Sequence, residues 1–177
     1  MLLFASAPPT GMSSSGGFGM RRRASSSTES RAAVEELITE LRKADDFQAL
    51  FYALLMKKRI ELGVSPFPTG PANELPPHTH EAYEDAIRTA GRHVGEQLLA
   101  RNEYGKAWTF YRMLGEPEPV RAALERFTPG PDDDVYPVIE IAWQNGVLPQ
   151  KGFDLAAAIV ERLVAAGGKP QKLLRIF

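Results

Sequence analysis

The sequence predicts an all-α protein built from stacked antiparallel helical hairpins. Apolar residues recur every three or four positions along most of the chain, which is the spacing of one helix face. Glycine and proline interrupt this pattern at short intervals, so neighbouring helices should pack as antiparallel pairs. No run of about four to eight residues alternates apolar and polar side chains as a half-buried strand would.

The N-terminal residues 1–29 are expected to form a disordered, low-complexity tail. They are rich in serine, glycine and arginine, and include the run Arg21–Arg23. A segment of this composition buries too little apolar surface to fold by itself. An Arg- and Ser-rich transit peptide is the alternative interpretation of the same residues.

A first helical hairpin is predicted after Ser30. Its first helix carries an apolar stripe at helical spacing, formed by Val34, Leu37, Ile38 and Leu41. Asp45 and Gln48 have the spacing of a capping box and predict the start of a second helix, which contains Phe47, Leu50, Phe51, Leu54 and Leu55. Gly63 followed by Pro66 predicts its end.

Residues 63–77 are predicted to form a long connection to the second hairpin. Five prolines lie in this range. Because proline fixes φ and favours extended backbone, we expect a stiff segment that acts either as a lid or as a spacer.

The second hairpin is expected to begin near Thr79 and to end at Gly115. Its first helix has an apolar face of Tyr83, Ile87, Ala90, Val94 and Leu98, and its second has Tyr104, Ala107, Trp108, Tyr111 and Leu114. Trp108 and Phe110 cannot share one helix face. One of them should therefore line a groove or contact a neighbouring hairpin.

Three more helices complete the predicted domain, which spans residues 30–168. The first follows Pro117, and the second lies between the Asp132–Asp134 run and Asn145-Gly146. Asp154 is expected to cap the last helix, and Gly167-Gly168 to end it. Residues 169–177 form a C-terminal tail that is rich in apolar residues. We expect it to fold back, to dock on a second copy in a homodimer, or to mark a truncated array.

Residues 88–121 resemble a tetratricopeptide repeat, a family of 34-residue helical hairpins. The resemblance rests on small and large residues at fixed offsets, namely Val94-Gly95, Leu98, Ala107, Tyr111, Leu114 and Pro119. Gly91 departs from the pattern, because the family usually has a large aromatic residue there. Residues 31–62 resemble a degenerate second copy.

The resemblance implies a scaffold or adaptor that binds a protein or peptide, because stacked repeats create a curved surface. It assigns this surface to four positions of the first helix, Thr89, Arg92, Glu96 and Leu99. Arg92 would hydrogen-bond a carboxylate of the partner.

A metal-dependent enzyme, or an accessory subunit of one, is the alternative hypothesis. His80 and Glu84 are four residues apart and could share a helix face, with His78 reaching them from the preceding loop. Polar residues are also common at helix starts, so a solvated helix entry explains the same three residues.

The composition limits the classes of partner, the location and the chemistry that can be expected of this protein. The net charge of −1 gives no general attraction to nucleic acid or to an anionic membrane, and neither is an expected partner. The absence of cysteine removes thiolate chemistry and fits a cytoplasmic location. No nucleotide loop, nucleophile elbow or metalloprotease motif is present, so no cofactor and no catalytic residue is predicted.

Overall fold

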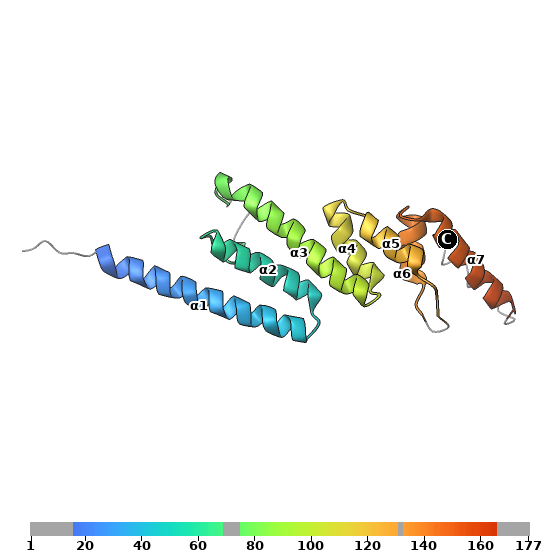
Figure 1. The fold of residues 1–177 in the computed structure, drawn as a ribbon, viewed down its shortest axis with the longest axis horizontal. Helices are drawn as coiled ribbons and strands as arrows, with labels where there is room; N and C mark the ends of the chain where they lie inside the picture. The colour runs from blue at the N-terminus through green and yellow to red at the C-terminus, as the bar shows by residue number, and fades with distance from the viewer. Residues whose placement is uncertain (1–15, 69–74, 131–132, 166–177) are drawn as a thin grey trace, which may run out of the picture.

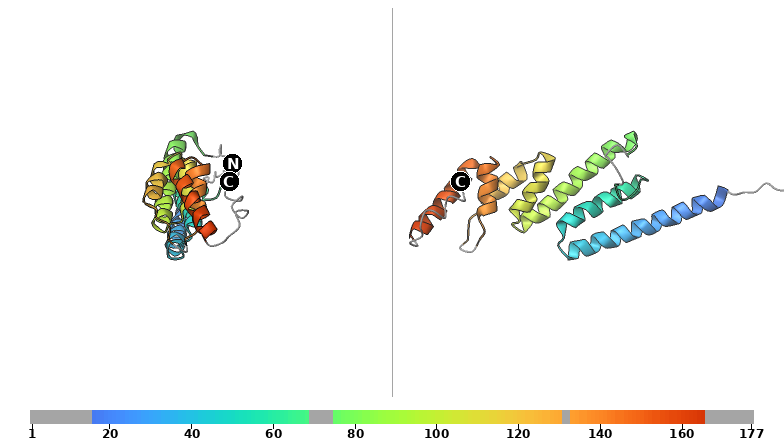
Figure 2. Two further views of the ribbon diagram at one scale, coloured as in Figure 1. Left: turned by 90° about the vertical axis from the view of Figure 1, so that its right-hand side faces the viewer. Right: turned by 180° about the vertical axis from the view of Figure 1, so that it is seen from behind.

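The computed structural model of the chain describes residues 16–68, 75–130 and 133–165. Seven α-helices follow one another within these residues, and no β-strand lies among them. The helices stack in chain order into an elongated array (Figure 1), and the view from behind shows the same order (Figure 2, right). The predicted all-α class with stacked hairpins is therefore confirmed.

Helices α1 (Gly16–Lys43) and α2 (Phe47–Glu61) form the first hairpin. Helix α1 begins at Gly16 rather than near Ser30, so residues 16–29 of the predicted tail continue the helix, while residues 1–15 lie outside the described part. Val34 and Ile38 anchor its C-terminal half, and extending an existing helix requires no new nucleus. Leu37 was expected to face inward, but its side chain is 40% exposed.

The N-terminal cap of α2 is Asp46, not Asp45 as predicted. Asp46 Oδ1 accepts a hydrogen bond of 3.0 Å from the backbone N–H of Ala49. Asp45 has a φ of 54° and forms the tight turn that ends α1. At the other end of α2, Gly63 has a φ of 72°, which confirms the predicted stop.

Arg59 holds the connection between α2 and α3 (His80–Ala100) at its first end. Its side chain is 5% exposed, and Nε donates a hydrogen bond of 2.5 Å to the carbonyl oxygen of Ser65. The guanidinium lies 5.8 Å from the ring centroid of Tyr83 on α3. Residues 69–74, the middle of the predicted stiff segment, lie outside the described residues.

The connection ends in η2, a short 3-10 turn that spans Pro77–Thr79 and leads into α3. Thr79 occupies the cap position of α3, as expected. However, its hydroxyl donates to the carbonyl oxygen of Pro76 at 2.7 Å and does not cap the helix.

Helix α3 pairs with α4 (Tyr104–Leu114) in the second hairpin. The helices approach closely at Gly95, where a Cβ atom would lie 2.7 Å from Cε2 of Tyr111. Ala107 is completely buried, and Gly115 ends α4 with a φ of 71°. The small residues Gly95 and Ala107 and the large residue Tyr111 therefore lie at this helix contact, as predicted from the sequence.

The C-terminal part consists of α5 (Glu118–Arg126), α6 (Tyr136–Ile139), the π-helical turn η3 (Glu140–Gln144) and α7 (Pro149–Ala165). Asp154 does not cap α7, because the helix begins earlier, at Pro149, whose missing N–H costs nothing in the first turn. Instead Asp154 accepts a hydrogen bond of 2.9 Å from the side chain of Gln150.

Two hydrophobic cores lie along the array, and α4 contributes to both. The first core joins α1, α2 and α3 to Ala107, with Phe110 packed against it. The second joins α5, α6, η3 and α7 to Tyr104 and Tyr111, with Trp108 packed against it. The described helices include none that combines the length and the apolar character of a membrane span.

Candidate interaction groove

The surface predicted from the repeat resemblance lies on the outer side of α3, where Thr89, Arg92 and Glu96 are exposed. Leu99 is half-buried and packs against both cores. The structure therefore leaves three of the four predicted residues open to a partner. No described pocket of the molecule is lined by them.

Arg92 already has a carboxylate partner within the chain. Its Nε and Nη2 atoms donate to the two carboxylate oxygens of Glu116, at 2.8 and 2.5 Å. These hydrogen bonds raise the pKa of Arg92 and lower the pKa of Glu116 below its ordinary value. A carboxylate of an incoming partner would have to compete with Glu116 for this guanidinium.

The structure does not assemble the predicted metal site. His80 Nε2 lies 2.8 Å from the carbonyl oxygen of Leu75, so that nitrogen is used by the backbone. Glu84 points to Arg88 instead, with 3.9 Å between their charged atoms. Among the described residues, no three His, Asp or Glu side chains form a group able to hold a metal ion. The described residues therefore do not bring His78, His80 and Glu84 together as a metal centre.

A cavity of about 320 Å³ lies where α2 and α4 separate next to the C-terminal end of α3. We call it the α2/α4 groove. Its lining residues come from the turn before α2, from α2, from α3 and from α4, and they are Asp45, Asp46, Phe47, Gln48, Phe51, Tyr52, Leu98, Lys106, Thr109, Phe110 and Met113.

Aromatic and aliphatic side chains form the interior of the groove. Leu98 of α3 is 1% exposed and is part of the first core below it. The rings of Phe51 and Phe110 meet edge to face across the two helices, with centroids 5.3 Å apart. Tyr52 and Met113 are 58% and 53% exposed, so one large apolar side chain from each helix stands open to solvent.

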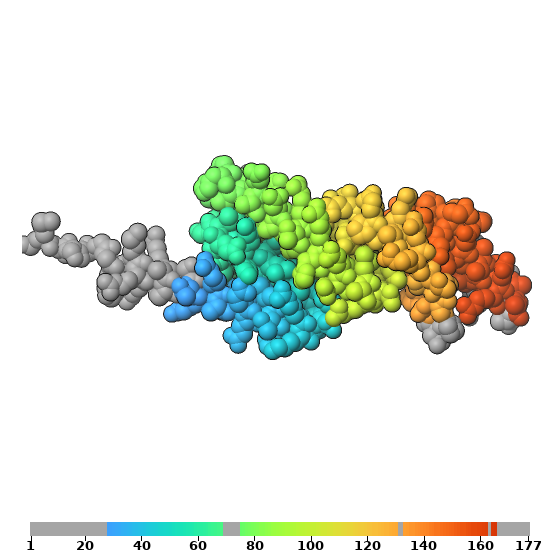
Figure 3. All heavy atoms as spheres, in the orientation of Figure 1, coloured from blue at the N-terminus to red at the C-terminus, as the bar shows by residue number. Residues whose placement is uncertain are grey.

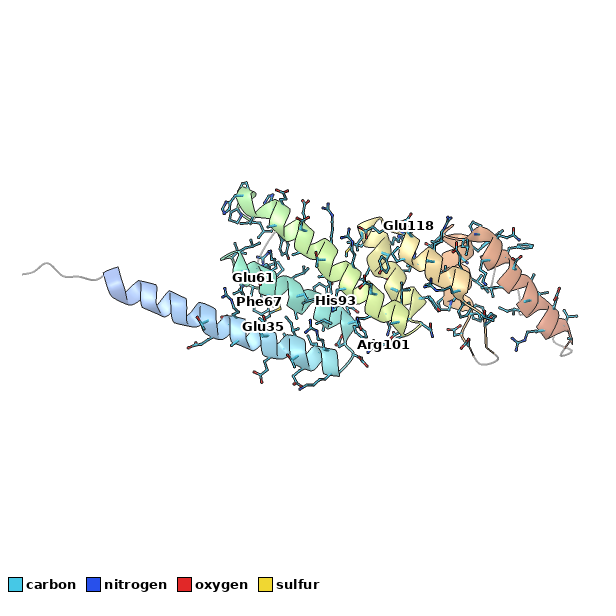
Figure 4. All side chains as sticks on the ribbon, viewed as in Figure 1. Glu35, Glu61, Phe67, His93, Arg101 and Glu118 are labelled. Carbon is cyan, nitrogen blue, oxygen red and sulfur yellow. The ribbon has the colours of Figure 1, made fainter. Side chains whose placement is uncertain are left out.

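Two of the three charged residues that line the groove, Asp45 and Lys106, form ion pairs within the chain. Arg101, at the C-terminal end of α3 (Figure 4), bonds Asp45 at 2.5 Å and covers the ring of Phe47 at 4.6 Å from its centroid. Lys106 pairs with Glu103, and Asp46 caps α2. The groove therefore combines an apolar interior with a nearly neutral surround.

Phe110 was predicted from the sequence to line a groove or to contact a neighbouring hairpin, whereas the exposed Tyr52 and Met113 were not predicted. The conflict between Trp108 and Phe110 is resolved as expected, because Phe110 lines the groove. Trp108 faces the second core, where its Nε1 is buried without a hydrogen-bond partner. Tyr52 was missed because it lies outside the apolar stripe of α2, and only the run Phe51-Tyr52 hinted at a second apolar face.

No family model, curated protein or solved structure matches the chain.

Proposed function

We propose that the protein is a scaffold or adaptor that binds a peptide segment, and that a large apolar side chain of this segment enters the α2/α4 groove. The observation that carries the proposal is the pair Tyr52 and Met113, which are more than half exposed on either side of an apolar cavity. Tyrosine and methionine are enriched at protein interfaces relative to other surfaces.

The size of the groove fits one or two side chains of a peptide. Its volume of about 320 Å³ is at the lower end of ligand pockets, which run from about 300 to 1,000 Å³. Burying one leucine, methionine or phenylalanine side chain there would contribute about 1.5–3 kcal/mol. Such an anchor is typical of interfaces in which a few residues supply most of the affinity.

The charges around the groove define the chemistry of the partner further. Asp45 is neutralised by Arg101, and Lys106 by Glu103, so neither pair offers a free charge. A partner with charged residues beside its anchor would have to break these pairs, whereas uncharged flanking residues leave them intact. The expected partner is therefore an apolar anchor between uncharged residues.

We propose in addition that α3 and α4 form a tetratricopeptide-like repeat, with α1 and α2 as a degenerate copy. The contact of Gly95 with Tyr111 and the burial of Ala107 support this assignment. A cytoplasmic location belongs to the same proposal, and its support is the cysteine-free sequence.

Selection from a random peptide library on the immobilised full-length protein tests the groove. We expect the enriched peptides to share one large apolar residue. Their affinity, measured by fluorescence anisotropy, should fall at least about tenfold with Met113→Asp, because a charge would enter the apolar cavity. Tyr136→Asp is the matched control, since Tyr136 is 54% exposed and belongs to α6.

The same peptides distinguish the groove from the outer surface of α3. If Arg92→Glu removes binding and Met113→Asp does not, the partner uses the α3 surface and the groove assignment is wrong. Peptides that bind Met113→Asp and Tyr136→Asp equally well would also contradict it.

A further inference from the structure

Helix α7 has a side that is buried in the second core and, next to it, an apolar row that the described residues cover only in part. The buried side includes Leu155 and Ala156, which belong to the second core. Beside it runs a row at helical spacing, formed by Phe153, Ala157, Val160 and Val164, of which Val160 also packs partly against the second core. Phe153 is 50% exposed and Val164 is 56% exposed, so both ends of this row face solvent.

Trp143 of η3 extends the row beyond α7. Its ring lies beside the ring of Phe153, with centroids 5.8 Å apart, and it is 43% exposed. Helix α7 forms one end of the described array, as the end-on view (Figure 2, left) and the space-filling view (Figure 3) show. An exposed apolar row is unusual at the end of a helical array, because such ends normally present a polar face.

The chain that follows α7 has the composition to cover this row. Residues 166–177 lie outside the described part, and they carry Leu173, Leu174, Ile176 and Phe177. Gly167-Gly168 follows the end of α7 after one residue, and glycine is the residue that most readily reverses the chain at a helix end.

The segment after α7 is long enough to cover the apolar row. Phe153 and Val164 are separated by about 16 Å along the helix, at about 1.5 Å per residue. Residues 168–177 span up to about 30 Å when extended, at about 3.3 Å per residue. The four apolar residues of the segment can therefore reach the whole row from Val164 to the Trp143–Phe153 ring pair.

The charges of the two surfaces are complementary. Asp154 and Glu161 are exposed and lie on α7 next to the apolar row, on the side away from the core. The segment that follows contains Lys169, Lys172 and Arg175 and no acidic residue. Basic residues interspersed with apolar ones suit a surface that is apolar along its centre and acidic along one edge.

We propose that residues 169–177 fold back along α7 and cover the row formed by Trp143, Phe153, Val160 and Val164, closing the end of the array within one chain. A second copy of the chain offers the same residues, but the attached segment is present at a far higher effective concentration because its linker is short. The proposal does not depend on the α2/α4 groove.

Fluorine NMR of the full chain with both tryptophans replaced by 5-fluorotryptophan tests this contact. The Trp143 signal is assigned with Trp143→Phe, and its solvent isotope shift is measured between H₂O and D₂O. This shift should rise roughly twofold in Leu174→Asp, since uncovering one face of a ring about doubles its contact with water. The Trp108 signal should not change, because that ring packs against the second core. Gln171→Asp adds the same charge to the segment and should leave both signals unchanged.

An equal Trp143 shift in the unmodified chain and in Leu174→Asp would overturn the proposal, and so would an equal effect of Gln171→Asp. Light scattering and dilution supply a second measurement. A molar mass of two chains, together with a Trp143 shift that depends on protein concentration, would show that another copy covers the row and that the segment does not fold back.

Discussion

The two cores of the molecule are built from helices of different length. Helices α1, α2 and α3 around the first core have 28, 15 and 21 residues, whereas α4, α5, α6 and α7 around the second have 11, 9, 4 and 17. The first core leaves a groove where α2 and α4 separate, and the second is closed by a tight contact between Gly152 and Trp143. The apolar groove therefore lies beside the first core, whereas the exposed apolar surface beside the second core is the row on α7 and η3.

The comparison predicts that neighbouring aromatic residues of α4 differ in their contribution to stability. Tyr111 is 1% exposed in the second core, so Tyr111→Ala should lower the free energy of unfolding by about 3–5 kcal/mol. Phe110 is half-buried in the groove wall, and Phe110→Ala should cost about half as much, since its cavity is already open on one side. Urea unfolding followed by circular dichroism measures both values.

Tyr111→Phe is the control for this pair, because it keeps the ring against Gly95 and should stay close to the unmodified protein. Equal losses for Tyr111→Ala and Phe110→Ala would mean that the groove wall is packed as firmly as the second core.

Two helical glycines test how tightly the second core is closed. A Cβ on Gly152 would lie 2.8 Å from the backbone nitrogen of Trp143, so Gly152→Ala should force α7 away and destabilise the protein by about 1–3 kcal/mol. A Cβ on Gly105 would lie 3.6 Å from Pro137, an ordinary contact, so Gly105→Ala should stabilise α4 by about 0.5–1 kcal/mol. Thermal unfolding should show melting temperatures that move in opposite directions, and shifts of the same sign would contradict this packing.

The smallest expected effect concerns Arg92 and Glu116, which connect α3 to the turn before α5. The folded-state pKa of Glu116 is lowered mainly by its hydrogen bond with Arg92. The pair therefore stabilises the fold above the unfolded pKa of a glutamate, and this contribution is lost as the pH falls through the lowered folded value.

Arg92→Met should raise the pKa of Glu116 toward its ordinary value, as measured by a carbon-13 NMR titration of the carboxyl group. Arg88→Met should raise it less, because Arg88 acts on Glu116 only through charge and is the last of the causes that lower its pKa. A titration unchanged by Arg92→Met would show that the ion pair does not form in solution.

The second hairpin could be predicted in detail because its determinants are local. Gly95, Ala107 and Tyr111 have sizes that only a close helix contact explains, and Gly115 is the residue type that a left-handed helix end requires. Helix class and hairpin pairing follow from such spacing, and the structure agrees with both.

The groove and the helix starts could not be predicted in this way. The groove depends on how α2 and α4 are oriented on either side of α3. The spacing of residues along the chain does not determine this orientation. The start of α1 depends on propagation from its anchored half, and the first turn of α7 depends on Pro149 more than on Asp154. The π-helical turn η3 contains Trp143, which lies close to Gly152 of α7, and the sequence pattern does not relate these two segments.

The position of α4 between the cores has a consequence for how the molecule unfolds. In many repeat arrays each unit contacts only its neighbours, so segments at the two ends can open separately. Here Ala107 and Phe110 on one side of α4, and Tyr104 and Tyr111 on the other, belong to a single helix of 11 residues. Melting this helix would remove a wall from both cores at once, and cooperativity therefore extends across the array through α4.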